Sequence, residues 1–355
     1  MKSYNCLIMA ENRKLKIDML SKATSAPAQG VGSVFIEQKR LIEELGKDDF
    51  EVFLNKHSGK YDLYHVHSVN PQYYRILKKR NSICFVHFLP DTLEGSIKLP
   101  KWAFRLFKKY VTAFYQRAKE IVVVNPSFID ALVGFGIERE RITYIPNFVS
   151  KEDFYQTSEE KKEEYREKYQ LPKDKFVVLG VGQVQTRKGI LDFIDISKKN
   201  PDMYFVWAGG FSFKNITDGY RELKKEMETK RDNLSFLGIR TRKEMNEIYN
   251  ACDCFLLPSY NELFPMALLE NCNISNPYIV RDLSLYKDIL VGDYLKADDN
   301  EGFSLILRKL ASDKDYYKKA SVLSEMMSEK YSRENVYLLW KDYYKKVYAK
   351  YKKQD

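Results

Sequence analysis

Short apolar runs alternate along the chain with longer stretches in which apolar residues recur every three or four positions. The longer stretches predict helices, and in the stretch 33–45 the residues Val34, Leu41, Ile42 and Leu45 fall on one face. The short runs, bounded by turn residues, predict strands at 16–20, 61–66, 83–88, 120–124, 176–181, 203–208, 234–237, 254–258 and 277–280. Because strands that alternate with helices build βα units, the pattern predicts an α/β fold with parallel sheets.

The alternation is interrupted once, near the middle of the chain. A charged stretch that favours helix, 158–170, follows Pro146-Asn147, and a new strand begins soon after Pro172. We therefore predict two α/β domains, 1–150 and 173–334, joined by a linker at 151–172. Ligands of open α/β sheets bind beyond the carboxyl ends of the strands, so we expect the functional site in a cleft between the two domains.

Composition and charge narrow the function classes. The 355 residues are 44% apolar and 14% aromatic, which is enough for large cores and excludes a wholly disordered chain. Of the net charge of +10, residues 1–150 carry +8, which predicts that the first half meets an anionic partner. No apolar run reaches the ~18–20 residues that span a bilayer, and the apolar segment 6–10 is too short for a signal peptide. We expect a cytosolic protein.

The five cysteines are scattered and odd in number, and they do not have the spacing of common zinc or redox pairs. We expect them to be buried free thiols. His65 and His67 lie two apart on one strand, but no further ligand cluster accompanies them, so we interpret them as strand residues and expect no metal.

The strand 176–181 leads into a glycine-containing turn that includes Gly182. Arg187 and Lys188 follow, just before a helix that begins near Ile190. Free N–H groups at a helix N-terminus favour phosphate, and two cations at that place strengthen the interpretation. The alternative is a surface loop with two solvated cations, and this motif alone does not separate the two.

A second cluster follows the strand 254–258. Glu262 lies in the loop before a helix, and Glu270 lies more than one turn inside that helix. Carboxylates accept hydrogen bonds from pairs of hydroxyls such as those of sugar and ribose rings. The alternatives are an ordinary acid at a helix start and a solvated helix residue. We expect neither Lys188 nor Glu262 in the core.

Together these motifs resemble the nucleotide-sugar half of retaining GT-B glycosyltransferases of family 4. The spacing Glu262-x7-Glu270, the turn with Arg187-Lys188-Gly189, and the segments 145–147, 207–210 and 236–238 carry the resemblance over nearly the whole chain. It implies two Rossmann-like domains that face each other across a cleft, with a C-terminal helix, 335–355, completing the first. It also implies retention of anomeric configuration, with the leaving phosphate taking the acceptor proton and no protein nucleophile.

The resemblance assigns roles residue by residue. Arg187 and Lys188 hold the donor diphosphate, Glu262 binds hydroxyls of the transferred sugar, and Glu270 holds the ribose. The remaining donor-site residues that it implies are Gly32, Gly182, Phe264 and His87, the last lying against the donor sugar at the end of the strand 83–88. Alone, Gly32 fits an ordinary tight turn, and a lone strand-end histidine is more often structural. The UDP-sugar is a substrate, and no cofactor is expected.

Residues 95–119 contain seven cations and no acid. Apolar residues recur there at helical spacing, while Lys101, Arg105, Lys108 and Lys109 fall on the opposite face, and Trp102 lies near the start. A basic amphipathic helix with aromatic residues is typical of proteins that lie on anionic bilayers. The alternative is a helix whose apolar stripe packs on its own sheet.

A finer resemblance concerns the segments 16–22, 29–33 and 86–91, which are similar to bacterial glycolipid synthases. It implies transfer of an α-hexose, galactose slightly before glucose, from UDP-galactose or UDP-glucose to glucosyl-diacylglycerol. The product is a dihexosyl lipid of the lipoteichoic acid anchor type, and the place is the cytoplasmic face of the membrane. The alternatives are a soluble or wall- or capsule-polymer acceptor, or a UDP-sugar epimerase of the same fold. A nucleic-acid module leaves Glu262 and Glu270 without a role, so no nucleic-acid partner is expected.

One departure from the family pattern lies after the strand 277–280. Many relatives carry a glycine pair there, whereas this chain has Arg281-Asp282. Gln183 likewise occupies a place where arginine is common, which leaves Arg187 and Lys188 with more of the phosphate charge.

Overall fold

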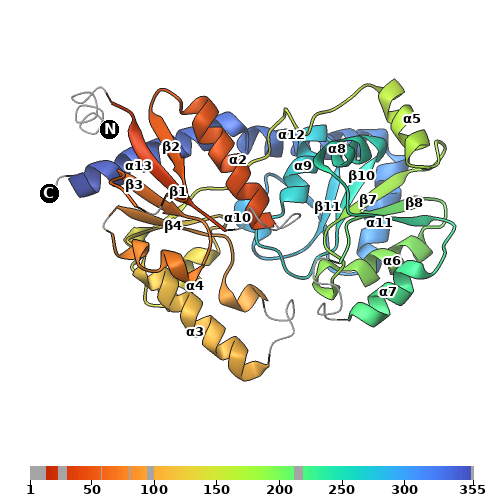
Figure 1. Cartoon of the computed structure of the whole chain (residues 1–355). Helices are drawn as coiled ribbons and strands as arrows, with labels where there is room; N and C mark the ends of the chain where they lie inside the picture. The colour runs from red at the N-terminus through yellow and green to blue at the C-terminus, as the bar shows by residue number, and fades with distance from the viewer. Residues whose placement is uncertain are drawn as a thin grey trace. The chain divides into compact units, whose positions relative to one another are not determined.

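The computed structural model describes residues 13–22, 30–56, 58–79, 81–93, 100–211 and 219–352. The chain divides into two compact units (Figure 1). The first comprises Met1–Thr92, Leu99–Phe148 and Arg333–Asp355, and the second comprises Leu93–Lys98 and Val149–Ser332. The last helix, α13 (Arg333–Lys352), therefore belongs to the first unit although it follows the second in sequence.

The first unit is built on a six-stranded parallel sheet with the order β2-β1-β3-β4-β5-β6. Its strands are β1 (Leu15–Leu20), β2 (Phe50–Leu54), β3 (Leu63–Val66), β4 (Ser82–Val86), β5 (Glu120–Val123) and β6 (Ile142–Tyr144). The chain runs from β1 to β2 in one direction and from β3 to β6 in the other. Right-handed crossovers therefore place α2 (Gly30–Leu45) on one face and α3 (Lys101–Arg117) and α4 (Phe128–Gly134) on the other (Figure 1).

Helix α13 packs against the first sheet beside α2. Trp340 and Tyr344 are fully buried, and the Gln38 amide of α2 donates a hydrogen bond of 3.1 Å to the Tyr344 hydroxyl. On the outer side, Lys341 and Lys345 both form ion pairs with Asp49, at 2.6 and 2.7 Å. Both of these α13 lysines are therefore paired with the same carboxylate.

The second unit repeats the plan with the parallel order β12-β11-β10-β7-β8-β9. Its strands are β7 (Val177–Val181), β8 (Tyr204–Ala208), β9 (Leu234–Gly238), β10 (Cys254–Leu257), β11 (Tyr278–Arg281) and β12 (Leu295–Ala297). Its helices are α5 (Glu159–Lys168), α6 (Ile190–Lys199), α7 (Tyr220–Glu228), α8 (Arg242–Ala251), α9 (Met266–Ile274), α10 (Tyr286–Ile289), α11 (Asn300–Ser312) and α12 (Lys314–Lys330). The sheet extends in both directions from β7, so helices again cover both faces.

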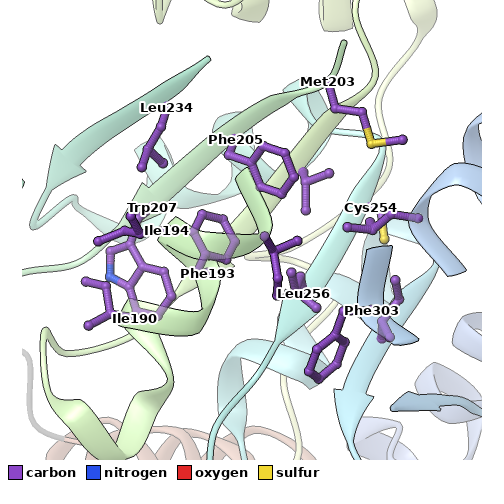
Figure 2. Packing of buried hydrophobic residues seen from close by; sticks show 14 of the residues in the cluster. Ile190, Phe193, Ile194, Met203, Phe205, Trp207, Leu234, Cys254, Leu256 and Phe303 are labelled. Carbon is purple, nitrogen blue, oxygen red and sulfur yellow. The ribbon is translucent and has the colours of Figure 1, made fainter. Parts of the chain in front are cut away.

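Aromatic side chains fill the core between the second sheet and α6 (Figure 2). Phe193 of α6 packs edge-to-face on Phe205 and Trp207 of β8, with ring centroids 5.5 and 5.2 Å apart. All three are completely buried. Full burial of a phenylalanine contributes up to ~3 kcal/mol, so this cluster fixes α6 firmly against the sheet. The N-terminus of α6 is thereby held at the carboxyl ends of the strands.

The predicted α/β class is confirmed, and each predicted strand is present with its ends within about two residues of the expected position. The prediction missed β2, β6 and β12, because β6 and β12 have only three residues and β2 lies at a sheet edge with half-exposed positions. Cys84, Cys252, Cys254 and Cys272 are buried free thiols, while Cys6 lies outside the described residues. Within the described residues, no helix combines the length and apolar character needed to cross a membrane.

Candidate functional site

The strand order places the two predicted loops of the second unit side by side. β7 and β10 are hydrogen-bonded neighbours, with Cys254 opposite Val178 and Phe255 opposite Leu179. The sheet grows from β7 to β8 and β9 on one side and from β10 to β11 and β12 on the other. The carboxyl ends of β7 and β10 therefore form a topological switch point, which is where open α/β sheets bind ligands.

Lys188 and Glu262 meet at this switch point. The Lys188 Nζ lies 2.6 Å from Glu262 Oε1, and the two side chains are only 15% and 5% exposed. Burial lowers the pKa of Lys188, the Glu262 carboxylate opposes that shift, and the neighbouring Arg187 adds to it. The expectation that neither residue lies in the core was wrong for Glu262, which is buried, whereas Lys188 is partly buried beside it. Each neutralises the other's charge, which makes this burial tolerable.

Backbone contacts hold the two loops together around this ion pair. Gly189 has φ of +70°, and a Cβ there would lie 2.2 Å from the Pro258 carbonyl oxygen, so only glycine fits. The Tyr260 N–H donates to the Arg187 carbonyl at 2.8 Å, and the Arg187 guanidinium donates to the Asn261 carbonyl at 3.2 Å. The cation-bearing turn Thr186–Lys188 is consequently locked against the loop that carries Glu262.

Gly182 is the first residue after β7 and begins the turn that leads to Arg187 and Lys188. Its φ is +156°, and its carbonyl oxygen accepts a hydrogen bond of 3.1 Å from Trp207 Nε1. A Cβ at Gly209 would lie 1.9 Å from that same oxygen, so the turns after β7 and β8 approach at backbone distance. Gly209 is needed for this close approach, because any side chain there would collide with the Gly182 carbonyl.

Glu270 is positioned by a residue that the sequence did not single out. The Tyr249 hydroxyl of α8 lies 2.8 Å from Glu270 Oε2 and 3.0 Å from the Ala267 carbonyl oxygen. Tyr249 is fully buried, and burial together with the Glu270 charge raises its pKa well above the usual value. Tyr249 therefore stays protonated and holds one oxygen of the half-buried Glu270 carboxylate. No spacing pattern in the sequence signals this contact.

Arg281, at the end of β11, is a second residue whose role becomes visible only in the structure. Its Nε donates to the Pro258 carbonyl at 3.0 Å and its Nη1 to the Asp298 carbonyl at 2.6 Å. The guanidinium also lies 4.0 Å from the Tyr260 ring centroid, and the Tyr260 hydroxyl donates to Asp192 of α6 at 3.0 Å. Arg281 thus ties the end of β11 to the loop that carries Glu262.

Phe264 is buried and packs edge-to-face against Tyr331, with ring centroids 5.3 Å apart. The structure therefore gives its ring a packing role in the second unit. Its place in donor binding stays a prediction.

Two candidate residues lie in the first unit. His87 follows β4 and is buried, and burial lowers its pKa to about 3, so the imidazole is neutral at physiological pH. Gly32 lies in the first turn of α2, which begins at Gly30, and Gln29 lies outside the described residues. The first N–H groups of a helix lack intrahelical acceptors, so this turn has donors to offer, and a contact of Gly32 with the donor phosphates stays a prediction.

Helix α3 has two dissimilar halves. In the second half, Val111, Phe114 and Tyr115 are buried, and Tyr115 donates to the Phe88 carbonyl at 2.8 Å. The first half exposes Trp102 (69%) and Leu106 (59%). The exposed cations on this half are Lys101, Arg105 and Lys109, whereas Lys108 is ion-paired with Asp91. The alternative, an apolar stripe that packs on the helix's own sheet, therefore applies only to the second half of α3. Another cation of the basic segment, Lys98, lies outside the described residues.

In the part of the chain that the structure describes, no three His, Cys, Asp or Glu side chains are grouped so that they could hold a metal ion. The expectation of metal-independent chemistry remains a prediction that activity measurements in EDTA test.

Two family models match this chain, one mainly in each of the two units. The family model described as "Glycosyltransferase Family 4" matches residues 39–153, and that described as "Glycosyl transferases group 1" matches residues 161–325. The chain is 41% identical over 352 residues to an alpha-galactosylglucosyldiacylglycerol synthase of Streptococcus pneumoniae, covering 98% of this chain and 94% of the relative. It is 26% identical to a processive diacylglycerol alpha-glucosyltransferase of Acholeplasma laidlawii, covering 81% and 86%.

Solved structures show the same fold. HepE of Anabaena in complex with UDP and glucose superimposes with a TM-score of 0.72 at 15% identity, covering 92% of this chain and 98% of that one. The lipopolysaccharide glycosyltransferase WaaG superimposes with a TM-score of 0.63 at 15% identity, over 92% and 98% of the two chains. The two parallel six-stranded sheets are those of the GT-B fold, as expected.

Proposed function

Because this chain belongs to glycosyltransferase family 4, we propose that it transfers α-galactose from UDP-galactose to glucosyl-diacylglycerol with retention of anomeric configuration. The similarity to the pneumococcal synthase, 41% over 98% of the chain, is the observation that carries this proposal. The second relative, a diacylglycerol glucosyltransferase, supports the same class of acceptor.

The second unit supplies the groups that a nucleoside-diphosphate sugar needs. Arg187, Lys188 and the N-terminus of α6 offer positive charge to the diphosphate. Glu262 offers a carboxylate to sugar hydroxyls, and Glu270, held by Tyr249, offers one to the ribose. When the donor enters, the Lys188 ammonium exchanges Glu262 for phosphate, and Glu262 exchanges Lys188 for hydroxyls.

Charge development explains how this arrangement promotes transfer. As the bond between the anomeric carbon and the phosphate oxygen breaks, the leaving diphosphate gains negative charge. Fixed cations and helix N–H groups stabilise that charge without reorganising at the moment of reaction. The acceptor hydroxyl attacks the anomeric carbon on the face that the phosphate leaves, and its proton goes to the departing phosphate oxygen. The donor provides the proton acceptor, so the chemistry needs no protein nucleophile.

The first half of α3 supports an acceptor that resides in a membrane. Trp102 and Leu106 are exposed apolar side chains flanked by the exposed cations Lys101, Arg105 and Lys109. Each cation near an anionic bilayer contributes about 1 kcal/mol, and an interfacial tryptophan adds an anchor. We propose peripheral attachment to the cytoplasmic face of the membrane, where a glycolipid anchor for lipoteichoic acid is made.

The proposal is tested by offering UDP-galactose and UDP-glucose separately to the purified protein with glucosyl-diacylglycerol in anionic vesicles, with and without EDTA. We expect a dihexosyl lipid from UDP-galactose, in equal yield with the chelator present, and its anomeric configuration is read from the proton NMR coupling of the new linkage. A product from UDP-glucose alone would overturn the donor assignment. UDP binding without a lipid product from either donor would overturn the acceptor and leave the glycosyltransferase assignment standing.

A further inference from the structure

Three histidines of the first unit form a buried cluster, and the transfer chemistry gives a role to His87 but none to His65 and His67. His65 lies in β3, His67 directly follows that strand, and His87 follows β4, and all three are less than 10% exposed. The ring centroids of His65 and His67 are 4.1 Å apart. His67 and His87 stack at 5.7 Å with an interplanar angle of 25°. The sequence suggested only that His65 and His67 share one side of a strand.

The cluster is joined to α13 by one hydrogen bond. The Tyr344 hydroxyl lies 2.8 Å from His65 Nδ1 and accepts a bond of 3.1 Å from the Gln38 amide. Among the described residues these are the only two hydrogen bonds of this hydroxyl, and which partner donates in the bond to His65 depends on the tautomer of that ring. The Nε2 of His65 is buried without a hydrogen-bond partner in the same part of the chain, so the bond to Tyr344 is the one that orients the ring. Burial lowers the pKa of His65 well below its usual value, which keeps the ring neutral.

Beyond His65, ring contacts replace hydrogen bonds. Both ring nitrogens of His67 and the Nε2 of His87 are buried without a hydrogen-bond partner in the described part of the chain. His67 is held instead by the edge of Phe35 at 4.9 Å, and Phe85 lies 4.3 Å from His87. The orientation of His87 therefore depends on the rings stacked behind it.

Helix α13 supports the same stack with a second side chain. The Trp340 ring lies 5.0 Å from His65 and 5.2 Å from Phe85, and both Trp340 and Tyr344 are fully buried. Trp340 and Tyr344, one helical turn apart, both contact the ring of His65, and Trp340 also contacts Phe85. His65 in turn contacts His67, and Phe85 contacts His87. A cluster that served packing alone would place apolar rings here, because burying unpaired imidazole nitrogens costs free energy.

We propose that Tyr344 is a positioning residue that sets the orientation of the His87 imidazole through His65 and His67. The inference rests on the proposed function and on the expectation, drawn from the family resemblance, that His87 contacts the donor sugar. The seating of α13 on the first sheet then determines whether His87 presents its ring correctly for transfer.

The chain offers a matched pair of variants for the test. Tyr344→Phe removes only the hydroxyl that bonds His65. Tyr343→Phe removes the neighbouring hydroxyl, which is equally buried but has no partner among the described residues. His67→Phe replaces the central imidazole by a ring of similar size, and His87→Ala removes the proposed sugar contact itself.

Nitrogen-15 spectra of histidine-labelled protein provide a readout independent of activity, since the chain has only four histidines. We expect Tyr344→Phe to shift the Nδ1 resonance of His65 and the resonances of His87, and to lower kcat about tenfold with the KM for UDP-galactose unchanged. Tyr343→Phe leaves the spectra and kcat as in the parent protein. Thermal unfolding confirms that both variants are folded.

Two outcomes overturn the inference. If Tyr344→Phe moves only the His65 resonances and leaves His87 and kcat unchanged, the hydrogen bond acts locally. If His67→Phe keeps full kcat, the stack does not transmit orientation. Full activity of His87→Ala refutes the sugar contact instead, while the coupled shifts in the spectra still test the positioning. Failure of the proposed function is thereby distinguished from failure of this inference.

Discussion

Lys188 and Glu262 are 74 residues apart in the sequence, yet they form an ion pair of 2.6 Å at the carboxyl ends of two adjacent parallel strands. Under the proposed function, each is the group that the other releases when a sugar nucleotide binds. The pair keeps two charges shielded from solvent and oriented, and we expect the phosphate and hydroxyl groups of the donor to replace these partners.

Replacing Glu262 tests this reciprocity. Glu262→Ala leaves the Lys188 ammonium buried without a partner, and breaking a buried pair in this way costs about 3–5 kcal/mol. Glu262→Gln keeps an acceptor for Lys188. We expect both variants to lose transfer at least about 100-fold, but only the alanine variant to show a clearly lower midpoint of thermal unfolding. Midpoints equal to that of the parent protein in both variants would show that the pair contributes nothing to stability.

Tyr249→Phe tests how Glu270 is held. The substitution removes the hydroxyl that lies 2.8 Å from the Glu270 carboxylate and retains the buried ring. Hydrogen bonds to charged groups contribute ~1.5–3 kcal/mol, so we expect the KM for the sugar nucleotide to rise about tenfold or more with kcat little changed. Tyr278→Phe is the matched control, because the Tyr278 hydroxyl is buried without a partner among the described residues. A rise in KM for both variants would point to a general loss of packing.

Substitution of Arg281 tests whether its contacts support the loop that carries Glu262. Arg281→Lys keeps the charge but cannot donate simultaneously to the Pro258 and Asp298 carbonyls. We expect donor binding, measured by titration calorimetry with UDP, to weaken about tenfold because the loop of Glu262 loses its support. Lys296→Met, which removes the nearby surface pair with Asp282, should leave binding unchanged. Unchanged affinity in the arginine variant would restrict Arg281 to folding.

Vesicle flotation tests the two halves of α3. Replacing Lys101, Arg105 and Lys109 with serine removes three exposed cations and should weaken binding to anionic vesicles about 100-fold at low salt. Serine at Lys224, Lys225 and Lys230 changes the net charge equally on the second unit and serves as the control. Lys108→Ser should have a smaller effect than Lys109→Ser, because Lys108 is paired with Asp91. Equal loss in both triple variants would show attraction by net charge alone.

The histidine cluster predicts a stability that depends on pH. Burial lowers the pKa of His65 and His67 well below the usual value and that of His87 to about 3, whereas an unfolded histidine titrates near ~6.5. Above that pH the rings are neutral in both states. Below it the unfolded chain binds protons that the native protein does not, so the free energy of unfolding falls as pH decreases.

Below the pKa of the unfolded histidines, we expect the free energy of unfolding to fall by about 1.4 kcal/mol per pH unit for each histidine. For the three histidines together the expected fall is about 4 kcal/mol per pH unit. Urea unfolding between pH 6 and 4.5 measures it, before most carboxylates titrate. His67→Phe should reduce the slope by about a third, since one proton no longer takes part. An unchanged slope in that variant would mean that other groups control the acid sensitivity.

The hydrophobic pattern alone determined the α/β class, the two-unit organisation and the loops in which Lys188 and Glu262 lie. Those features depend on whether each side chain faces core or solvent, and periodicity along the chain records that directly. It also located the charged and glycine-rich segments, because turn residues and charges interrupt the apolar runs.

The tertiary structure decided which of these segments meet. The same pattern of strands is compatible with several sheet orders, and only the packing of helices on both faces makes β10 the neighbour of β7. That choice buries Lys188 against Glu262 and sets Tyr249 on Glu270. It equally decided that one half of α3 packs on the sheet while Trp102 and Leu106 remain exposed, since a repeat of three and four residues does not state how far the supporting sheet extends beneath a helix.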